Sequence, residues 1–179
     1  YCTKGEPVIR QDVLTKITLE AKIPGILGNC HASGLNIIKD FGLKHLESGM
    51  PIVYTSDDSV IQIAAHERYF GLEKLYSLCR LVADIFHPLG LCRVIARPFT
   101  GSTPADFFRT HNRKDFAIPP PEGTICERIN QGNGNCYGIG KIGEIFSDRG
   151  IQTFSKNKTD QELFDNVLDC LKICRDRDL

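Results

Sequence analysis

The sequence predicts an α+β fold, a mainly antiparallel sheet with helices packed on it. Helical segments and short β-like segments both recur along the chain, and a tight polar turn joins the strands expected at 52–55 and 60–65. Hydrophobic content of 41% and charged content of 25% are ordinary for a globular protein. A chain of 179 residues can bury a proper core, so one domain over residues 1–179 is expected.

Apolar residues three and four positions apart predict the helices. The expected helices lie at 9–23, 35–47, 72–86, 124–129 and from 159 onward. Gly42 is expected to break or bend the second helix. Thr159 and Glu162 form a capping-box pattern at the start of the last helix. Its buried face is expected to consist of Leu163, Phe164, Val167, Leu168, Leu171 and Cys174.

Short apolar runs bounded by turn residues predict the strands. The expected strands lie at 52–55, 60–65, 92–96, 116–118, 136–139 and 151–154. Pro98 is expected to end the third of these just after Arg97, because proline cannot donate to a β-ladder. The run Pro119–Pro121 predicts a stiff connector that is too short to mark a domain boundary.

The charges balance, with 22 basic and 22 acidic residues. This balance argues against bulk binding to nucleic acid or to a membrane surface, so neither partner is expected. The sequence contains no apolar run of transmembrane length and opens with no signal-peptide pattern. Because the chain does not begin with Met and has only Met50, we expect it to be a piece of something longer.

Eight cysteines would allow four disulfides, but their spacing is irregular and several lie on predicted apolar faces. Free thiols in the reducing cytoplasm are therefore expected. The chain has no CxxC motif, and Cys30 and His31 are neighbours rather than a spaced chelate. A zinc site is not expected.

Basic residues gather between Leu91 and Pro121. Arg97 is expected at the end of a strand, and Arg109 and Arg113 follow close together. The planar guanidinium group suits the forked recognition of a phosphate or a carboxylate. The alternative is a solvated basic loop with surface ion pairs.

Two further segments have polar residues at predicted turns. The turn Ser56-Asp57-Asp58-Ser59 suits the binding of sugar hydroxyls, although turn formation alone also explains it. Gly140 and Gly143 lie around Lys141 at a strand-to-helix junction, where an ammonium group and backbone N–H groups can meet an anion. The spacing is not that of a nucleotide P-loop.

Four stretches together carry a resemblance to a known family. They are LGNCHASG (27–34), PIVYTSDDSVIQIAAHE (51–67), RVIARPFTG (93–101) followed by RTHNRKDFAIPPP (109–121), and GIGKIGEIF (138–146). In this order the stretches resemble the cap domain of bacterial-type phosphopentomutases, in the alkaline phosphatase superfamily. The resemblance covers essentially the whole chain.

The resemblance implies an isomerase, an intramolecular phosphotransferase that interconverts ribose 1-phosphate, or its deoxy form, with the 5-phosphate. It implies two manganese ions and a phosphoryl-carrying threonine, all in a core domain of the parent chain. This chain would be the cap that closes over the sugar phosphate. The core segments of the DxFG, DTPSGHWE and TADHG types do not occur in it, so the chain alone is expected to be inactive and to bind no metal.

The resemblance also implies six substrate-binding residues: Ser56, Asp58, Arg97, Arg109, Arg113 and Lys141. The serine and the aspartate match the sugar-facing turn, and the basic residues match groups for sugar oxygens and for the phosphate that is not transferred. Arg109 is expected rather to support the loop by ion pairing. Asp57 departs from the pattern of the turn. Two alternatives stay open: a free-standing sugar-phosphate-binding or assembly domain without catalysis, and the cap of another metal-dependent phosphomutase.

Overall fold

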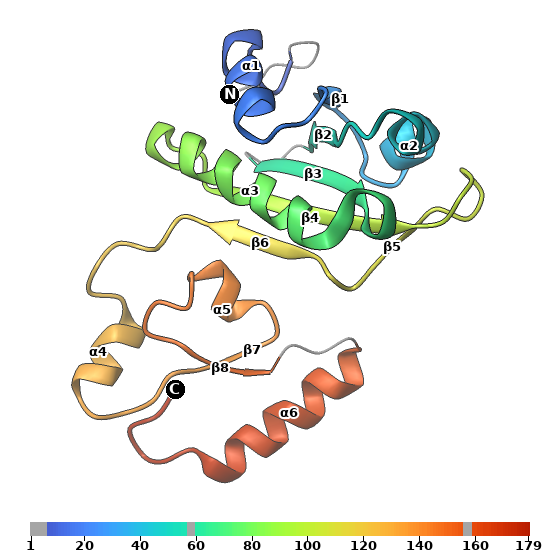
Figure 1. Cartoon of the computed structure of the whole chain (residues 1–179). Helices are drawn as coiled ribbons and strands as arrows, with labels where there is room; N and C mark the ends of the chain where they lie inside the picture. Colours follow the sequence, from blue (N-terminus) through green and yellow to red (C-terminus); the bar gives the residue numbers. More distant parts are fainter. Residues whose placement is uncertain (1–6, 57–59, 156–158) are drawn as a thin grey trace. The chain divides into compact units, whose positions relative to one another are not determined.

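The computed structural model describes residues 7–56, 60–155 and 159–179. The chain divides into two compact units, Tyr1–Phe116 and Ala117–Leu179 (Figure 1). The division falls just before the Pro119–Pro121 run, which the sequence assigned to the interior of one domain. The single domain over the whole chain stays a prediction.

The first unit is built on a mixed β-sheet. Its strands are β1 (Leu27–His31), β2 (Ile52–Thr55), β3 (Val60–His66), β4 (Arg93–Thr100), β5 (Phe108–Arg109) and β6 (Lys114–Ala117). The first five follow one another in the sheet, and β6 also pairs with β4. Strand pairs β1–β2 and β3–β4 are parallel, whereas β2–β3 and β4–β5 are antiparallel.

The α+β class is confirmed, but the sheet is mixed where a mainly antiparallel one was expected. The reason lies in two crossover helices, α2 (Asn36–Ser48) between β1 and β2 and α3 (Leu72–Phe86) between β3 and β4. A helix of this length carries the chain back to the start of the next strand, so the two strands run in the same direction. The unit also contains α1 (Gln11–Glu20), a π-helical turn η1 (Glu67–Gly71) and a 3₁₀ turn η2 (His87–Leu89).

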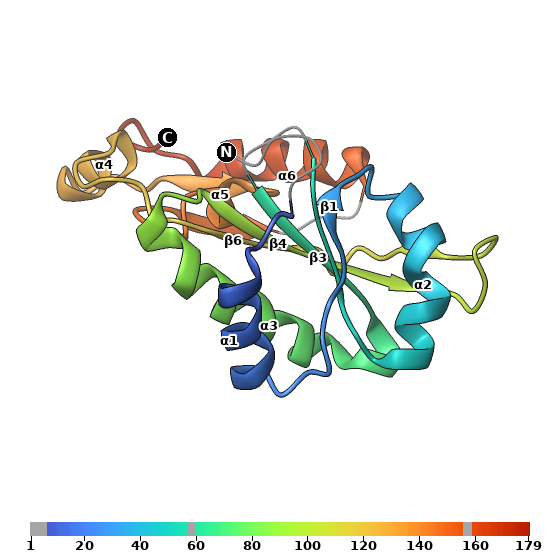
Figure 2. The ribbon, with the colours of Figure 1, turned by 90° about the horizontal axis from the view of Figure 1, so that it is seen from above.

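Helices cover the two faces of this sheet with separate apolar cores. Figure 2 shows α1 and α3 near one another and α2 apart from them. Ile61 and Ile63 of β3 lie in the core beneath α1 and α3, whereas Ala64 of the same strand lies in the core beneath α2. Because side chains alternate along a strand, neighbouring residues face opposite sides of the sheet.

Helix α2 runs unbroken through Gly42, where the sequence predicted a break or a bend. The glycine is buried, and a Cβ atom added to it would lie 2.3 Å from Cε2 of Phe107. This position is therefore explained by the close approach of the Phe107 ring to the helix backbone, not by a change in helix direction.

Strand β4 also continues through Pro98, where the sequence predicted its end. The carbonyl oxygen of Pro98 accepts a hydrogen bond of 3.1 Å from the backbone N–H of Thr110. Proline lacks only the donor, so a strand can include it where its carbonyl group alone is used. Arg97 consequently lies inside the strand instead of at its end.

The second unit consists of α4 (Ile125–Gln131), β7 (Tyr137–Ile139), α5 (Ile142–Ile145), β8 (Gln152–Ser155) and α6 (Asp160–Ile173). Strands β7 and β8 pair in parallel. Thr159 caps α6 as predicted, and its hydroxyl group accepts from the backbone N–H of Glu162.

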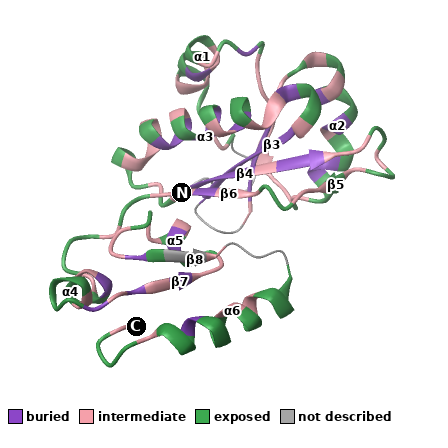
Figure 3. Cartoon of the chain, turned by 60° about the horizontal axis from the view of Figure 1, so that its bottom comes forward, coloured by how far each residue is buried: buried purple, intermediate pink, exposed green. Residues whose placement is uncertain are grey.

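The predicted buried face of α6 is largely exposed (Figure 3). Exposed fractions range from 40% to 64% for four of the six residues, namely Val167, Leu168, Phe164 and Leu171. Leu163 and Cys174 are half-buried. Within its unit the helix packs on only two strands, which are too narrow to cover the whole apolar stripe.

The seven cysteines that the structure describes are free thiols. None of the helices in the described ranges is long and apolar enough to cross a membrane.

Candidate anion-binding site

The candidate site lies on the α2 face of the sheet. Tyr54 of β2 pairs with Gln62 of β3 in the antiparallel register, and Arg97 of β4 pairs with Ala64. Tyr54 and Ala64 belong to the core beneath α2, which places these side chains on one face of three adjacent strands. Neighbouring positions along β3 and β4 face α3 and are apolar.

A chain of hydrogen bonds joins two of the predicted residues through Gln62. Nε of Arg97 donates to Oε1 of Gln62 at 3.0 Å, and Nε2 of Gln62 donates to Oγ of Ser56 at 3.1 Å. Gln62 is buried, with 5% of its surface exposed. The amide fixes the guanidinium plane of Arg97 through Nε and leaves the two terminal nitrogens of Arg97 available for an anion.

Arg113, just before β6, is held by an acidic side chain. Its Nε and Nη2 donate to the two carboxylate oxygens of Asp115 at 2.7 and 2.8 Å, a bidentate arrangement. Arg93 approaches the same carboxylate, with Nη1 3.7 Å from Oδ2. The Asp115 side chain is only 2% exposed. The structure thus shows the supporting ion pair at Arg113, where the sequence predicted it for Arg109.

The positive charges of Arg109 and Arg113 act on Arg97, and all three arginines act on Tyr54. Burial lowers the pKa of Arg97 below its ordinary value, and the positive charges of Arg113 and Arg109 lower it further. Burial raises the pKa of Tyr54, while Arg97, Arg109 and Arg113 act in the opposite direction. A bound anion would relieve the mutual repulsion of the guanidinium groups.

Arg109, on β5, lies beside Gly34 in the loop between β1 and α2. A Cβ atom added to Gly34 would lie 3.3 Å from Nη2 of Arg109 and 2.6 Å from the Tyr54 hydroxyl oxygen. The absence of a side chain at residue 34 therefore lets these two polar groups converge.

Glu67 orders the segment between β5 and β6. Its carboxylate accepts hydrogen bonds from the Thr110 hydroxyl group and, at 2.9 Å, from Nδ2 of Asn112. The Tyr76 hydroxyl group donates to the backbone carbonyl of Asn112 at 2.7 Å. His66, the neighbour of Glu67, caps η1 through Nδ1. These contacts hold the segment that carries Arg109 and Arg113.

The remaining predicted residues are not placed with the arginines. Asp58, together with Asp57, lies outside the described residues. Lys141 belongs to the second unit, where it is exposed and precedes α5 at the predicted strand-to-helix junction. The backbone N–H of Gly140 donates to Ser155 at 3.0 Å and is thus already used.

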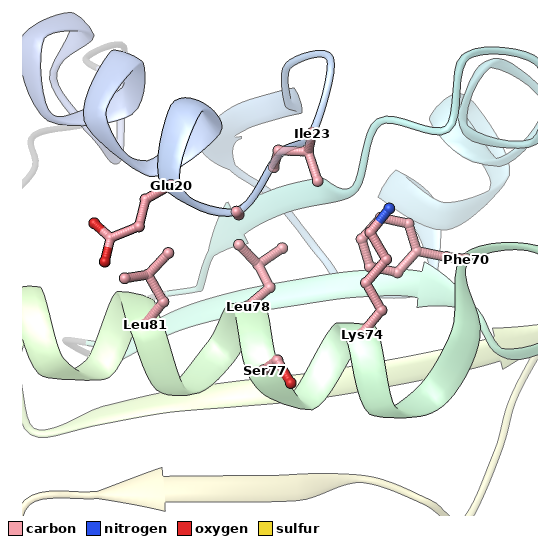
Figure 4. Close-up of a pocket in the computed structure, with 8 residues that line it drawn as sticks. Glu20, Ile23, Phe70, Lys74, Ser77, Leu78 and Leu81 are labelled. Atoms are coloured by element: carbon pink, nitrogen blue, oxygen red, sulfur yellow. The ribbon is translucent and has the colours of Figure 1, made fainter.

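A separate pocket of about 330 Å³ lies between α1 and α3 (Figure 4). Glu20, Ile23, Phe70, Lys74 and Leu78 are among its lining residues. The Lys74 ammonium lies 4.7 Å from the centre of the Phe70 ring, a cation–π contact. Of the predicted site residues that the structure describes, none lines this pocket.

Within the three described ranges, no group of three or more His, Cys, Asp or Glu side chains is arranged to hold a metal ion. Asp115, the acidic side chain that holds Arg113, is engaged with two arginines.

The chain matches no protein-family model. A phosphopentomutase of Rhizobium rhizogenes is 48% identical to it over 179 residues, 100% of this chain and 44% of the relative. A phosphopentomutase of Agrobacterium fabrum is 47% identical with the same coverage. That of Chromohalobacter salexigens is 48% identical over 168 residues, 94% of this chain and 40% of the relative.

The chain is homologous to the phosphopentomutases. The resemblance that the four sequence stretches indicated is thereby confirmed, and it extends over the chain's full length. The chain spans 40–44% of the length of these three relatives.

Three polar residues of the site in this phosphopentomutase homologue were not predicted from its sequence. Gln62 had a signal, because it interrupts the apolar run VIQIAA of a buried strand. Asp115 is separated by one residue from Arg113, and in a strand such residues share a face. Tyr54 gave no signal, since an aromatic residue in a strand is ordinary core material.

Proposed function

We propose that this chain is the substrate-closing cap segment of a phosphopentomutase, the isomerase that interconverts ribose or deoxyribose 1-phosphate with the 5-phosphate. One observation carries the proposal: a buried amide orients Arg97 on the sheet face, and the positive charges of Arg109 and Arg113 lie close enough to lower its pKa. Homology to phosphopentomutases over the whole chain supports it.

In this proposal Arg97 and Arg113 bind the phosphate that is not transferred. Gln62 orients Arg97, and Asp115 orients Arg113, so each guanidinium loses little freedom when the ligand arrives. Ser56, joined to Gln62, presents a hydroxyl group to the sugar. Binding energy from the distal phosphate positions the reacting end of the substrate and stabilises closure of the cap.

We further propose that Asp58 and Lys141 read the sugar hydroxyls and the phosphate, and that Arg109 contributes charge. The two manganese ions and their ligands belong to the core domain of the parent protein, where they would stabilise charge on the transferring group. Because that core domain supplies the reacting groups in this proposal, the chain alone is inactive, and its partners are the pentose phosphate and that core domain.

Turnover of the complete protein tests this function. We expect conversion of ribose 5-phosphate to ribose 1-phosphate and no mutase activity on phosphoglycerates. Activity on phosphoglycerates alone would contradict the proposal and favour a different phosphomutase. A native protein with an intact mass near 20.0 kDa would contradict it too, because a free-standing binding domain would then be the whole product.

A further inference from the structure

The hydroxyl group of Tyr54 is buried without a hydrogen-bond partner. The residue is 0% exposed, and its ring packs in the core beneath α2 with Ile37, Ile52 and Phe99. Its hydroxyl oxygen is a buried side-chain polar atom with no partner among the described residues. Buried hydroxyl groups in native proteins are nearly always satisfied, so this one calls for an explanation.

The surroundings of this hydroxyl group are rich in hydrogen-bond donors. Arg97, Arg109 and Arg113 are the charged groups that act on Tyr54, and a guanidinium group has donors but no acceptor. The raised pKa of Tyr54 keeps the phenol protonated at neutral pH, so the hydroxyl group is a further donor. Among the described residues, no acceptor pairs with this hydroxyl group.

Gly34 lets two of these donors converge, because it has no side chain to separate them. Nη2 of Arg109 and the Tyr54 hydroxyl oxygen both lie within 3.3 Å of the point that a Cβ atom at residue 34 would occupy. Any larger residue at this position would fill the space where the phenol and the guanidinium converge.

We propose that Tyr54 is a further ligand-binding residue of the site and that its hydroxyl group donates a hydrogen bond to an oxygen of the bound phosphate group. The phosphate oxygens are the acceptor that Arg97, Arg109 and Tyr54 share. In the structure the hydroxyl group is covered, so Arg109 turns from its place beside Gly34 onto the anion as the ligand enters. The inference rests on the proposed function and adds to it a neutral donor beneath the arginines.

Tyr54→Phe in the complete protein tests the inference, since it removes the hydroxyl oxygen and retains the ring in the core. We expect KM for ribose 5-phosphate to rise about 10-fold or more, as for a lost hydrogen bond to a charged group. The melting temperature of the ligand-free protein should stay the same or rise, because an unsatisfied buried group is removed. The rise in melting temperature on adding ribose 5-phosphate should become smaller. Tyr69→Phe, on a ring that is 68% exposed, is the matched control and should change none of these quantities.

The outcomes separate this inference from the proposed function. The role of Tyr54 alone would be overturned by the following result. The wild-type protein converts ribose 5-phosphate, and Tyr54→Phe has the same KM and the same ligand-induced rise in melting temperature as wild type. A wild-type protein without turnover of ribose 5-phosphate would overturn the proposed function and this inference with it. A raised KM in Tyr54→Phe, together with an undiminished ligand-free melting temperature, would support the role in binding, because a purely structural role predicts no change in KM.

Discussion

The two faces of the sheet in the first unit come from the same strands but have different contents. On the face beneath α1 and α3, β3 and β4 contribute Ile61, Ile63 and Val94, and the core is apolar. On the α2 face, the alternate positions include Gln62 and Arg97, which are joined by a hydrogen bond. One face therefore supplies hydrophobic stabilisation, while part of the other holds oriented polar groups.

This difference indicates how a small sheet can build a rigid site. The buried amide of Gln62 and the buried carboxylate of Asp115 each fix one arginine. Both orienting groups lie on strands whose opposite face is anchored in the apolar core, so their positions are set by the sheet. Substitutions on the two faces should accordingly separate stability from ligand binding.

The largest effect is expected on the apolar face. Leu75→Ala truncates an α3 side chain that is 1% exposed in the core. We expect the free energy of unfolding to fall by about 3–5 kcal/mol, with KM for the pentose phosphate unchanged in the protein that remains folded. Urea denaturation and steady-state kinetics measure the two quantities. A change of KM comparable to that of the arginine variants would break the distinction between the faces.

Arg113→Ala should affect both properties. Loss of its proposed contact to the phosphate should weaken transition-state binding by about 2–4 kcal/mol, which is measured as a lower kcat/KM. Its removal also takes the bidentate ion pair from the buried Asp115 carboxylate, so the free energy of unfolding should fall by about 2 kcal/mol. Asp115→Asn is the companion variant, because it releases Arg113 and retains its charge. If Arg113→Ala had normal kinetics, Arg113 would be a structural residue only.

Arg97→Ala should change binding alone. Its guanidinium group forms no ion pair with any described residue, and its hydrogen-bond acceptor is the neutral Gln62. We expect kcat/KM to fall by a factor that corresponds to about 2–4 kcal/mol of transition-state binding. The melting temperature should stay close to that of wild type. Arg80→Ala, on the solvent side of α3, serves as the control for loss of one positive charge. Equal kinetics in the Arg97 and Arg80 variants would remove Arg97 from the site.

His45 predicts a smaller, pH-dependent effect on stability. Its Nδ1 donates to the Met50 carbonyl at 2.6 Å, and its Nε2 accepts from the backbone N–H of His66 at 2.9 Å, so the ring is neutral. Burial lowers the pKa of His45 below its ordinary value of 6.5. The unfolded chain therefore takes up a proton first as the pH falls. The contribution of His45 to stability is complete above pH 6.5 and is lost as the pH falls through the lowered pKa of the folded state.

Denaturation at several pH values measures this contribution. The slope from His45 can reach at most about 1.4 kcal/mol per pH unit. His45→Asn, whose amide can still donate to Met50, should flatten the slope below pH 6.5 relative to wild type. An unchanged slope would show that another group controls the acid sensitivity.

Local patterns were sufficient to predict most of the helices and strands. The three- and four-residue spacing predicted a helix at 72–86, and α3 has these bounds. The chain direction in β1–β2 and β3–β4 was not predictable from the strands themselves, because it depends on where the crossover helices pack.

The predictions that failed depend on contacts between distant residues. Gly42 meets Phe107, and the Pro98 carbonyl meets Thr110, so neither has its usual local effect on the chain. The sequence predicted Ser56, Arg97 and Arg113 as site residues. That Gln62 and Asp115 orient the two arginines follows from side-chain contacts between strands, which the local pattern does not contain.

A crystal structure of the complete protein with ribose 5-phosphate would show whether the arginines bind the phosphate. We expect the phosphate on the α2 face of the sheet, with its oxygens about 3 Å from the terminal nitrogens of Arg97. A pentose phosphate bound elsewhere in the protein, with the terminal nitrogens of Arg97 and Arg113 facing solvent, would contradict it.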